Sequence, residues 1–164
     1  MVDRIDILSR LNPGSELHGI RRERPEFVEG AELCRRAVLT PNSDFGISHA
    51  MRAALAARMA RLIGLEDLAK SYDAQRESSD GDEMLRIIAS GSDLPTGGNF
   101  FTAALVRHAD LVTTKPRDST RSDIQRLEEA GLSNSQIVAI SELIAFVNFE
   151  ARVIVGLRAL EAVT

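Results

Sequence analysis

Cysteine and tryptophan are scarce: the 164 residues include one cysteine, Cys34, and no tryptophan. One thiol cannot build a disulfide framework or a cysteine-rich metal site. The three histidines, His18, His49 and His108, are scattered without the spacing of metal ligands. The stretch "TGGN" lacks the following lysine and the preceding strand of a phosphate-binding loop. We therefore expect no metal and no cofactor.

The sequence also has no excess of positive charge. The formal net charge is −4, whereas general nucleic-acid binding needs a basic face that displaces the counterions of phosphates. The cluster Arg21, Arg22 and Arg24 is interleaved with Glu23 and Glu26, which is typical of a solvated turn. We expect no nucleic-acid partner.

Long apolar runs are absent as well. Polar and charged residues interrupt the longest apolar stretches, so none would cross a bilayer at low cost. The beginning, "MVDRIDILSRL", contains acids and no long apolar run, and it does not resemble a secretory signal. The sequence predicts no membrane partner and a cytoplasmic location.

The abundant residues, alanine, leucine, arginine and glutamate, favour helix, and no stretch sustains the apolar–polar alternation of a strand. The length and the 44% hydrophobic composition suit one domain over residues 1–164. The predicted fold class is therefore all-α. Apolar periodicity, caps and breakers predict helices at 4–11, 25–39, 49–62, 65–77, 83–89, 100–112, 121–130 and 134–162.

Two places in this helical pattern are expected to be irregular. A flexible loop at about 78–99 contains the turn "SSDGDE" and the stretch "SGSDLPTGGN", with 83–89 as one short helix within it. Gly64 interrupts an otherwise continuous helical pattern. Because glycine costs about 1 kcal/mol relative to alanine inside a helix, it indicates a bend at this position.

Several reactive side chains have structural interpretations. Cys34 shares an apolar stripe with Ala31 and Val38, and should be buried as a small hydrophobe. His108 also lies on an apolar stripe, which favours a core histidine with satisfied hydrogen bonds. Tyr72, the only tyrosine, either caps the core or acts as a donor in a pocket. If it is buried, its hydroxyl should have a hydrogen-bond partner.

An internal repeat relates two parts of the chain. "GISHAMRAALAARMARLIG" from 46 aligns without gaps with "GLSNSQIVAISELIAFVNF" from 131. Gly46 matches Gly131, and Ser48 matches Ser133. The shared glycine, apolar residue and serine favour duplication, with repeat halves at about 46–77 and 131–162.

Two stretches resemble the carboxymuconolactone decarboxylase / AhpD-like superfamily: "GISHAMRAALAARMARLIGLEDLAKSYDAQ" and "TRSDIQRLEEAGLSNSQIVAISELIAFVNFEARVIVGLRAL". They cover most of 46–75 and 120–160. The second is similar to a subgroup of decarboxylase-domain proteins related to the alkylhydroperoxidase-like branch. The resemblance implies an AhpD-like helical bundle with an internal helical repeat, usually assembled as a homo-oligomer.

In the peroxidase-like branch, the family carries C-x-x-C followed four residues later by histidine, and a relay glutamate on the preceding helix. The thiolate of such a pair attacks the peroxide. Matched to this sequence, the cysteines fall on Leu65 and Leu68, and the histidine on Tyr72. No acidic residue lies between Arg52 and Gly64. The resemblance therefore implies a member that is not a C-x-x-C-dependent peroxidase.

The last helix carries a narrow polar line, Ser141, Asn148 and Arg152, on an otherwise apolar surface. One interpretation is a structural polar network or an ion pair between subunits, since a buried arginine must be paired. In the register of the repeat, Arg152 matches Asp67. If a pseudo-two-fold axis relates the halves, we expect these two side chains to meet.

The other interpretation is a pocket. The planar fork of Arg152 suits a carboxylate or similar anion, and Tyr72 or Glu142 would transfer a proton. Arg52, on the first repeat helix, is expected to extend its head toward water or to pair.

Two functions follow from these patterns. The first is an oligomeric subunit without peroxidase chemistry, with a structural or regulatory role, either alone or beside a cysteine-bearing homologous partner. The second is a thiol-independent enzyme, of decarboxylase or isomerase type, that acts on a small anionic or lactone-like substrate.

Overall fold

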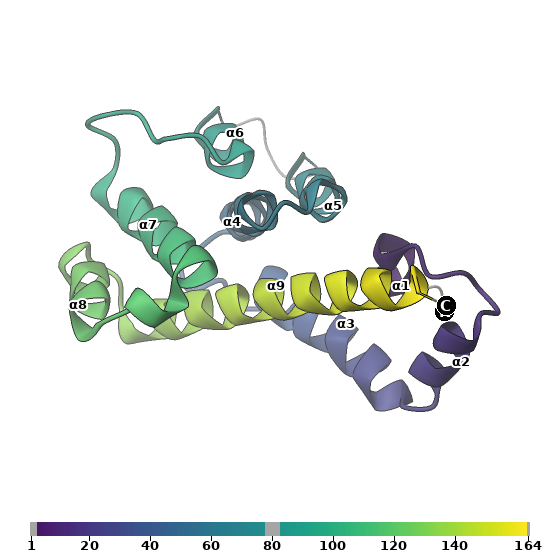
Figure 1. Ribbon diagram of the computed structural model, residues 1–164. Coiled ribbons are helices and arrows are strands. Elements are labelled where there is room, and N and C mark those ends of the chain that lie inside the picture. Colours follow the sequence, from purple (N-terminus) through teal and green to yellow (C-terminus); the bar gives the residue numbers. More distant parts are fainter. Residues whose placement is uncertain (1–2, 78–82, 164) are drawn as a thin grey trace.

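The computed structural model describes residues 3–77 and 83–163, and within these ranges the chain is all-α, with nine α-helices, one 3-10 helix and no strand (Figure 1). The prediction of an all-α fold is confirmed. The helices are α1 (Arg4–Ser9), α2 (Glu16–Arg22), α3 (Pro25–Leu39), α4 (His49–Leu62), α5 (Glu66–Glu77), α6 (Glu83–Ser90), α7 (Phe100–Thr114), the 3-10 helix η1 (Pro116–Asp118), α8 (Arg121–Glu129) and α9 (Asn134–Glu161).

Helix α9 is the long axis of the molecule, and α1, α3, α4, α7 and α8 all contact it. In Figure 1 it crosses the view, whereas α4 is seen end-on, so the two helices cross steeply. The predicted capping box at its start is confirmed: Ser133 accepts from the Gln136 N–H, and the Gln136 side chain accepts from the Ser133 N–H.

Helix α4 lies at the centre of the core, and ten of its residues are buried. Six of the ten are alanines, whose small side chains let neighbouring helices approach closely. Helices α5, α6, α7 and α9 pack around it. The alanine-rich sequence therefore has a packing reason, as well as favouring helix.

The bend predicted at Gly64 is present. Helix α4 ends at Leu62, and Gly64 has a φ of +83°, which residues with a side chain rarely adopt. The N–H of Leu65 then donates to the Ala60 carbonyl at 2.9 Å, the backbone pattern that closes many helix C-termini. The turn buries Leu65 and starts α5 alongside α4.

The two repeat halves begin alike and meet in space. Gly46 and Gly131 both have positive φ, at 77° and 90°. Ser48 and Ser133 both accept a hydrogen bond from the N–H three residues later. The Gln136 side chain also donates to the Phe45 carbonyl at 2.8 Å, so the second start contacts the first.

The short helix predicted at 83–89, within the loop expected at about 78–99, is confirmed. Residues 83–90 form α6, whose Leu85, Ile88 and Ala89 are buried, so this part of the expected loop belongs to the core. Hydrophobic contact with α4 explains why the segment is helical. Most of the turn "SSDGDE" lies outside the described residues.

The solvated turn expected at Arg21, Arg22 and Arg24 is wrong for the first two arginines. Residues 16–22 form α2, capped by Ser15. The Arg21 Nε donates to Asp6 at 2.5 Å, and Arg22 also pairs with Asp6. The acids that fix these arginines lie on α1, too far along the chain for a local pattern to indicate them.

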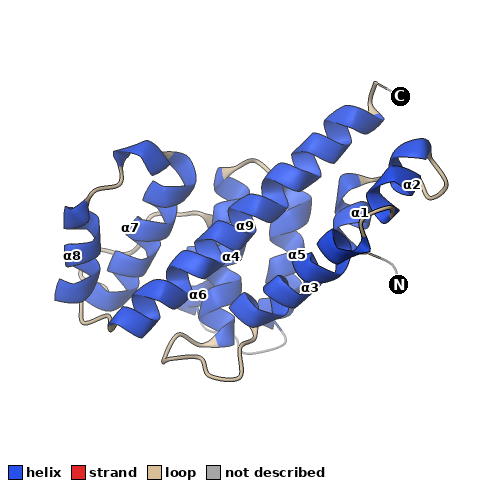
Figure 2. Ribbon diagram, turned by 90° about the horizontal axis from the view of Figure 1, so that it is seen from below, coloured by secondary structure: helices blue, strands red, loops and turns tan. Residues whose placement is uncertain are grey.

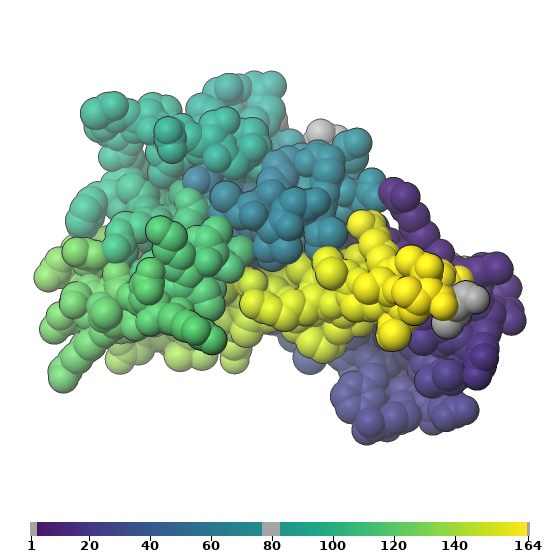
Figure 3. Space-filling view, viewed as in Figure 1, coloured from purple at the N-terminus to yellow at the C-terminus, as the bar shows by residue number. Residues whose placement is uncertain are grey.

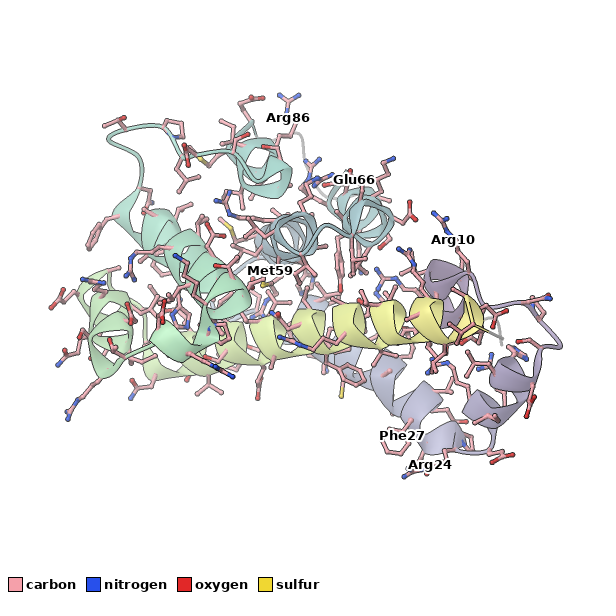
Figure 4. The ribbon with its side chains drawn as sticks, in the orientation of Figure 1. Arg10, Arg24, Phe27, Met59, Glu66 and Arg86 are labelled. Carbon is pink, nitrogen blue, oxygen red and sulfur yellow. The ribbon has the colours of Figure 1, made fainter. Side chains whose placement is uncertain are left out.

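Cys34 is exposed, so the prediction of a buried cysteine is wrong. Helix α3 buries Ala31, Val38 and Leu39, whereas Phe27 stays 52% exposed. In Figure 1 the first half of α3 leans away from α9 toward α2, which leaves the apolar stripe of this half largely uncovered. Figure 4 shows Phe27 beside Arg24 at the outer end of the helix, and the guanidinium lies 4.1 Å from the ring centre.

Candidate functional site

The most buried polar contact joins Tyr72 of α5 to Glu150 of α9. Tyr72 is 0% exposed and Glu150 1% exposed, and the phenol donates a hydrogen bond to the Glu150 Oε2. The prediction that a buried Tyr72 finds a partner is therefore confirmed. Burial, followed by the nearby charge of Glu150, holds the pKa of the Tyr72 phenol well above its ordinary value.

Arg4 of α1 closes this contact from the solvent side. Its Nη1 donates to the Glu150 Oε1 at 2.7 Å, and its guanidinium lies 4.7 Å from the centre of the Tyr72 ring. Its Nη2 donates to the Ser71 hydroxyl, which in turn donates to the Leu68 carbonyl at 2.5 Å. We call Arg4, Ser71, Tyr72 and Glu150 the Tyr72 cluster.

The charges around the Tyr72 cluster are balanced in pairs. Glu150 faces Arg4, whose side chain is 24% exposed. Arg35 of α3 also feels the charge of Glu150, but it is held by Glu32, with bonds of 2.7 and 2.8 Å. The hydrogen bond to Glu32 is the main cause that raises the pKa of Arg35. Each polar atom of Tyr72 and Glu150 is thus engaged within the protein.

The three positions matched to the thiol motif are buried side by side, at the turn before α5 and along one face of α5. Leu65, Leu68 and Tyr72 are all buried, at spacings of three and four residues that align on one side of a helix. Leucine side chains therefore pack as core at both cysteine positions. At the histidine position, Tyr72 packs as core and bonds to Glu150.

The polar line on α9 lies elsewhere. Asn148 is buried and donates to the Thr113 hydroxyl of α7 at 3.3 Å and to the Ile144 carbonyl at 3.0 Å. Arg152 is exposed and donates to the Asn148 carbonyl at 3.0 Å. Ser141 is exposed and donates to the Ile137 carbonyl at 2.7 Å, and Glu142 is exposed too. Only Asn148 of this line is buried.

The structure therefore does not bring Tyr72 together with Asn148 and Arg152. Tyr72 contacts Glu150, and two helical positions differ by about 200° around the axis, so Asn148 faces α7 instead. Arg152 is exposed in the single chain and bonded to Asn148, so the predicted ion pair between subunits stays a prediction.

The expected meeting of Arg152 with Asp67 is also wrong. Asp67 pairs with Arg10 at 2.9 Å and with Arg158 at 3.3 Å. The reason is the bend at Gly64: the first repeat half turns there, whereas α9 continues straight, so matched positions beyond the bend separate.

Arg52 is the buried arginine of the first repeat half. Its three nitrogens donate to the backbone carbonyls of Ile47, Val38 and Asp44 at 2.9, 3.0 and 2.9 Å. Burial lowers its pKa, and the charges of Asp44 and Glu142 oppose that shift. The predicted pairing thus uses one carbonyl group near the end of α3 and two of the segment between α3 and α4, which the sequence pattern did not indicate.

His108 is buried as predicted, but its Nδ1 has no hydrogen-bond partner among the described residues. Burial is the main cause that lowers the pKa of its imidazole, which favours the neutral ring. His49 is exposed, and its Nε2 lies 3.0 Å from the Pro41 carbonyl. Within residues 3–77 and 83–163, His, Cys, Asp and Glu side chains form no group of three suited to a metal ion.

A pocket of about 270 Å³ lies between α6 and the start of α7. None of the predicted site residues lines it. Its walls are Met84, Leu94, Pro95, Gly97, Gly98, Asn99, Phe100, Thr102 and Ala103. These side chains offer no charge and no acid–base group, so the pocket is a place for apolar contact rather than for the predicted chemistry.

Comparison of the chain with protein-family models gives no match, and comparison with curated proteins gives no match either. Membership of the carboxymuconolactone decarboxylase / AhpD-like superfamily therefore stays a prediction from the sequence. No helix in the described part of the chain has the length and apolar character needed to cross a membrane.

Proposed function

We propose that this chain is a structural or regulatory, self-associating member of the carboxymuconolactone decarboxylase / AhpD-like superfamily without peroxidase chemistry. The observation that carries the proposal is the state of the matched motif. Tyr72, at the histidine position, is fully buried and hydrogen-bonded to Glu150, and Leu65 and Leu68 fill the cysteine positions with core. A reactive site needs an accessible nucleophile, and leucine has none.

The only thiol does not replace the missing pair. Cys34 lies on the exposed face of α3, and no second cysteine exists to resolve an oxidised form. The exposed position of Cys34 therefore supports the interpretation that it is a surface residue without a catalytic role.

Self-association is supported by the apolar surface of the described helices. Leu33 on α3 is 66% exposed, and Val138 and Phe149 on α9 are 56% and 43% exposed. Exposed apolar side chains gathered on neighbouring helices are typical of protein contact surfaces. The α3 and α9 helices contact one another, so these side chains belong to adjoining elements.

The alternative of a thiol-independent enzyme needs Arg152 and Tyr72 at one site. Those two side chains lie on different sides of α9, and the Tyr72 cluster is closed by Arg4. The geometry therefore supports the structural role better.

The test has two measurements on the full chain. When the protein is mixed with a hydroperoxide and a dithiol reductant, we expect the hydroperoxide to be consumed no faster than without protein. This should hold for wild type and for Cys34→Ser alike. Light scattering during size exclusion should give a molar mass above that of one chain. Peroxide turnover that Cys34→Ser abolishes would overturn the chemical part of the proposal, and a monomer at all concentrations would overturn the assembly part.

A further inference from the structure

One face of α9 is uncovered along most of its length. Seen from below in Figure 2, no other helix is drawn over α9, and Figure 3, viewed as in Figure 1, shows the second half of α9, in yellow, at the surface. Eight exposed residues lie within about 40° of one line on this helix, at about 100° per residue: Asn134, Leu160 and six residues between them. We call these central six the α9 stripe: Val138, Glu142, Ala145, Phe149, Arg152 and Gly156.

The residues of the α9 stripe are arranged symmetrically about Val147. When two α-helices run antiparallel around a two-fold axis at this level, each position faces the position equally far beyond Val147 in the other copy. The pairs matched in this way are Val138 with Gly156, Glu142 with Arg152, and Ala145 with Phe149.

Each of these pairs is complementary. The large Phe149 faces the small Ala145, and Val138 faces Gly156, which has no side chain. In both pairs a larger apolar side chain therefore packs against a smaller residue of the other copy. Glu142 and Arg152 stand about 7.5 Å on either side of the axis, since a helix rises 1.5 Å per residue. An antiparallel pair therefore brings opposite charges together twice, once at each end.

Both charged residues are available for such a contact. Neither Glu142 nor Arg152 forms an ion pair with another described residue, and both are exposed. Arg152 is bonded to the carbonyl and side-chain oxygens of Asn148, at 3.0 and 3.3 Å, on its own helix. The charge of Glu142 acts on Arg52 without a direct bond.

We propose that two copies of this chain pair antiparallel through the α9 stripe, with Glu142 of each copy facing Arg152 of the other. The inference rests on the proposed self-association and specifies its geometry. A parallel pair is disfavoured, because it would place Glu142 against Glu142 and Arg152 against Arg152. An unrelated partner would not require the symmetry about Val147.

The decisive experiment uses two charge-reversed variants, Glu142→Arg and Arg152→Glu. Each variant alone places like charges together at both ends of the pair, so its association constant should fall about tenfold or more. When the two variants are mixed, Arg at 142 faces Glu at 152, and the native Arg152 faces the native Glu142. The mixture should therefore associate as well as wild type, measured by sedimentation velocity over a range of concentrations.

Two controls separate this geometry from general effects of charge. Glu128→Arg on α8 changes the net charge equally but lies off the α9 stripe, and should associate as wild type does. Circular dichroism should show wild-type helicity in all variants, because both arginine and glutamate favour helix. In 1 M NaCl the difference between the single variants and the mixture should shrink, since salt screens exposed charges.

The outcomes distinguish the two proposals. If wild type associates but the single variants associate equally well, or the mixture does not recover, the antiparallel pairing is overturned while self-association stands. If wild type remains a single chain at every concentration, both fail. If only the mixture and wild type associate, the pairing is established.

Discussion

The phenol of Tyr72 and the carboxylate of Glu150, 78 positions apart in the chain, form a fully buried hydrogen bond between α5 and α9. Arg4, which lies 146 positions before Glu150 in the sequence, donates to the other oxygen of the same carboxylate. Three helices are therefore joined by one acidic side chain. The buried bond makes Tyr72, which the predicted resemblance matches to the histidine of the thiol motif, part of the contact between these helices.

Tyr72→Phe should destabilise the protein by about 1–3 kcal/mol, because it leaves one buried oxygen of Glu150 without its donor. Glu150→Gln should have a similar effect, since it weakens the bond to Arg4. The double variant should lose less than the sum of the two, as expected for residues in contact. Urea unfolding at a fixed protein concentration gives these free energies. The exposed Glu128→Gln should stay within about 0.5 kcal/mol of wild type, and additivity of the two buried changes would contradict the direct contact.

Ionisation of Tyr72 should follow unfolding rather than precede it. Free tyrosine ionises near pH 10, whereas burial and the charge of Glu150 raise the pKa of Tyr72 in the folded protein. Below pH 10 both states keep the phenol proton, so this group adds no pH dependence there. Above it the unfolded chain releases the proton first, so stability falls as pH rises.

The measurement is direct because the chain has one tyrosine and no tryptophan. Ultraviolet absorbance of tyrosinate reports Tyr72 alone, and circular dichroism reports folding. The difference in unfolding free energy between wild type and Tyr72→Phe should shrink as pH rises above about 10. Tyrosinate absorbance that appears near pH 10 in a fully helical protein would show that the phenol is accessible.

Local signals in the sequence were sufficient for much of the fold. The capping box at Ser133 and Gln136 and the glycine at Gly64 act within a few residues, so they mark the start of α9 and the end of α4 correctly. Helix α6 was predicted at 83–89, but its place in the core was not, because the burial of Leu85 and Ile88 depends on contact with α4 rather than on its flanking residues.

The site was harder to predict for a physical reason. Helix α9 is apolar nearly all round, so polarity does not indicate which of its faces is inside. Glu150 is buried and Arg152 is exposed, although they are two residues apart and the arginine was predicted to be the buried one. Tyr72 and Arg4, the partners that show which face of α9 is buried, come from distant parts of the chain.

Arg52 should resist even conservative replacement. Its three nitrogens hold one carbonyl of α3 and two of the segment that joins α3 to α4, and a lysine has one nitrogen that cannot reach all of them. Arg52→Lys should lower the free energy of unfolding by about 2 kcal/mol. Hydrogen exchange should speed up at residues 40–48 more than elsewhere. The matched change Arg10→Lys, in an exposed ion pair with Asp67 at the surface (Figure 4), should alter stability by less than about 0.5 kcal/mol. Equal losses in the two variants would mean that the carbonyl contacts contribute nothing particular.

Two glycine-to-alanine changes should have opposite signs. At Gly64, with a φ of +83°, alanine should destabilise by about 1–2 kcal/mol, although nothing within 4 Å blocks its methyl group. At Gly30, inside α3 and equally free of neighbours, alanine should stabilise by about 0.5–1 kcal/mol, since it restricts the unfolded chain and favours helix. Thermal and urea unfolding of both variants measure the difference. Because space is open at both positions, only backbone conformation separates them, and a stabilised Gly64→Ala would show that the bend does not need its left-handed residue.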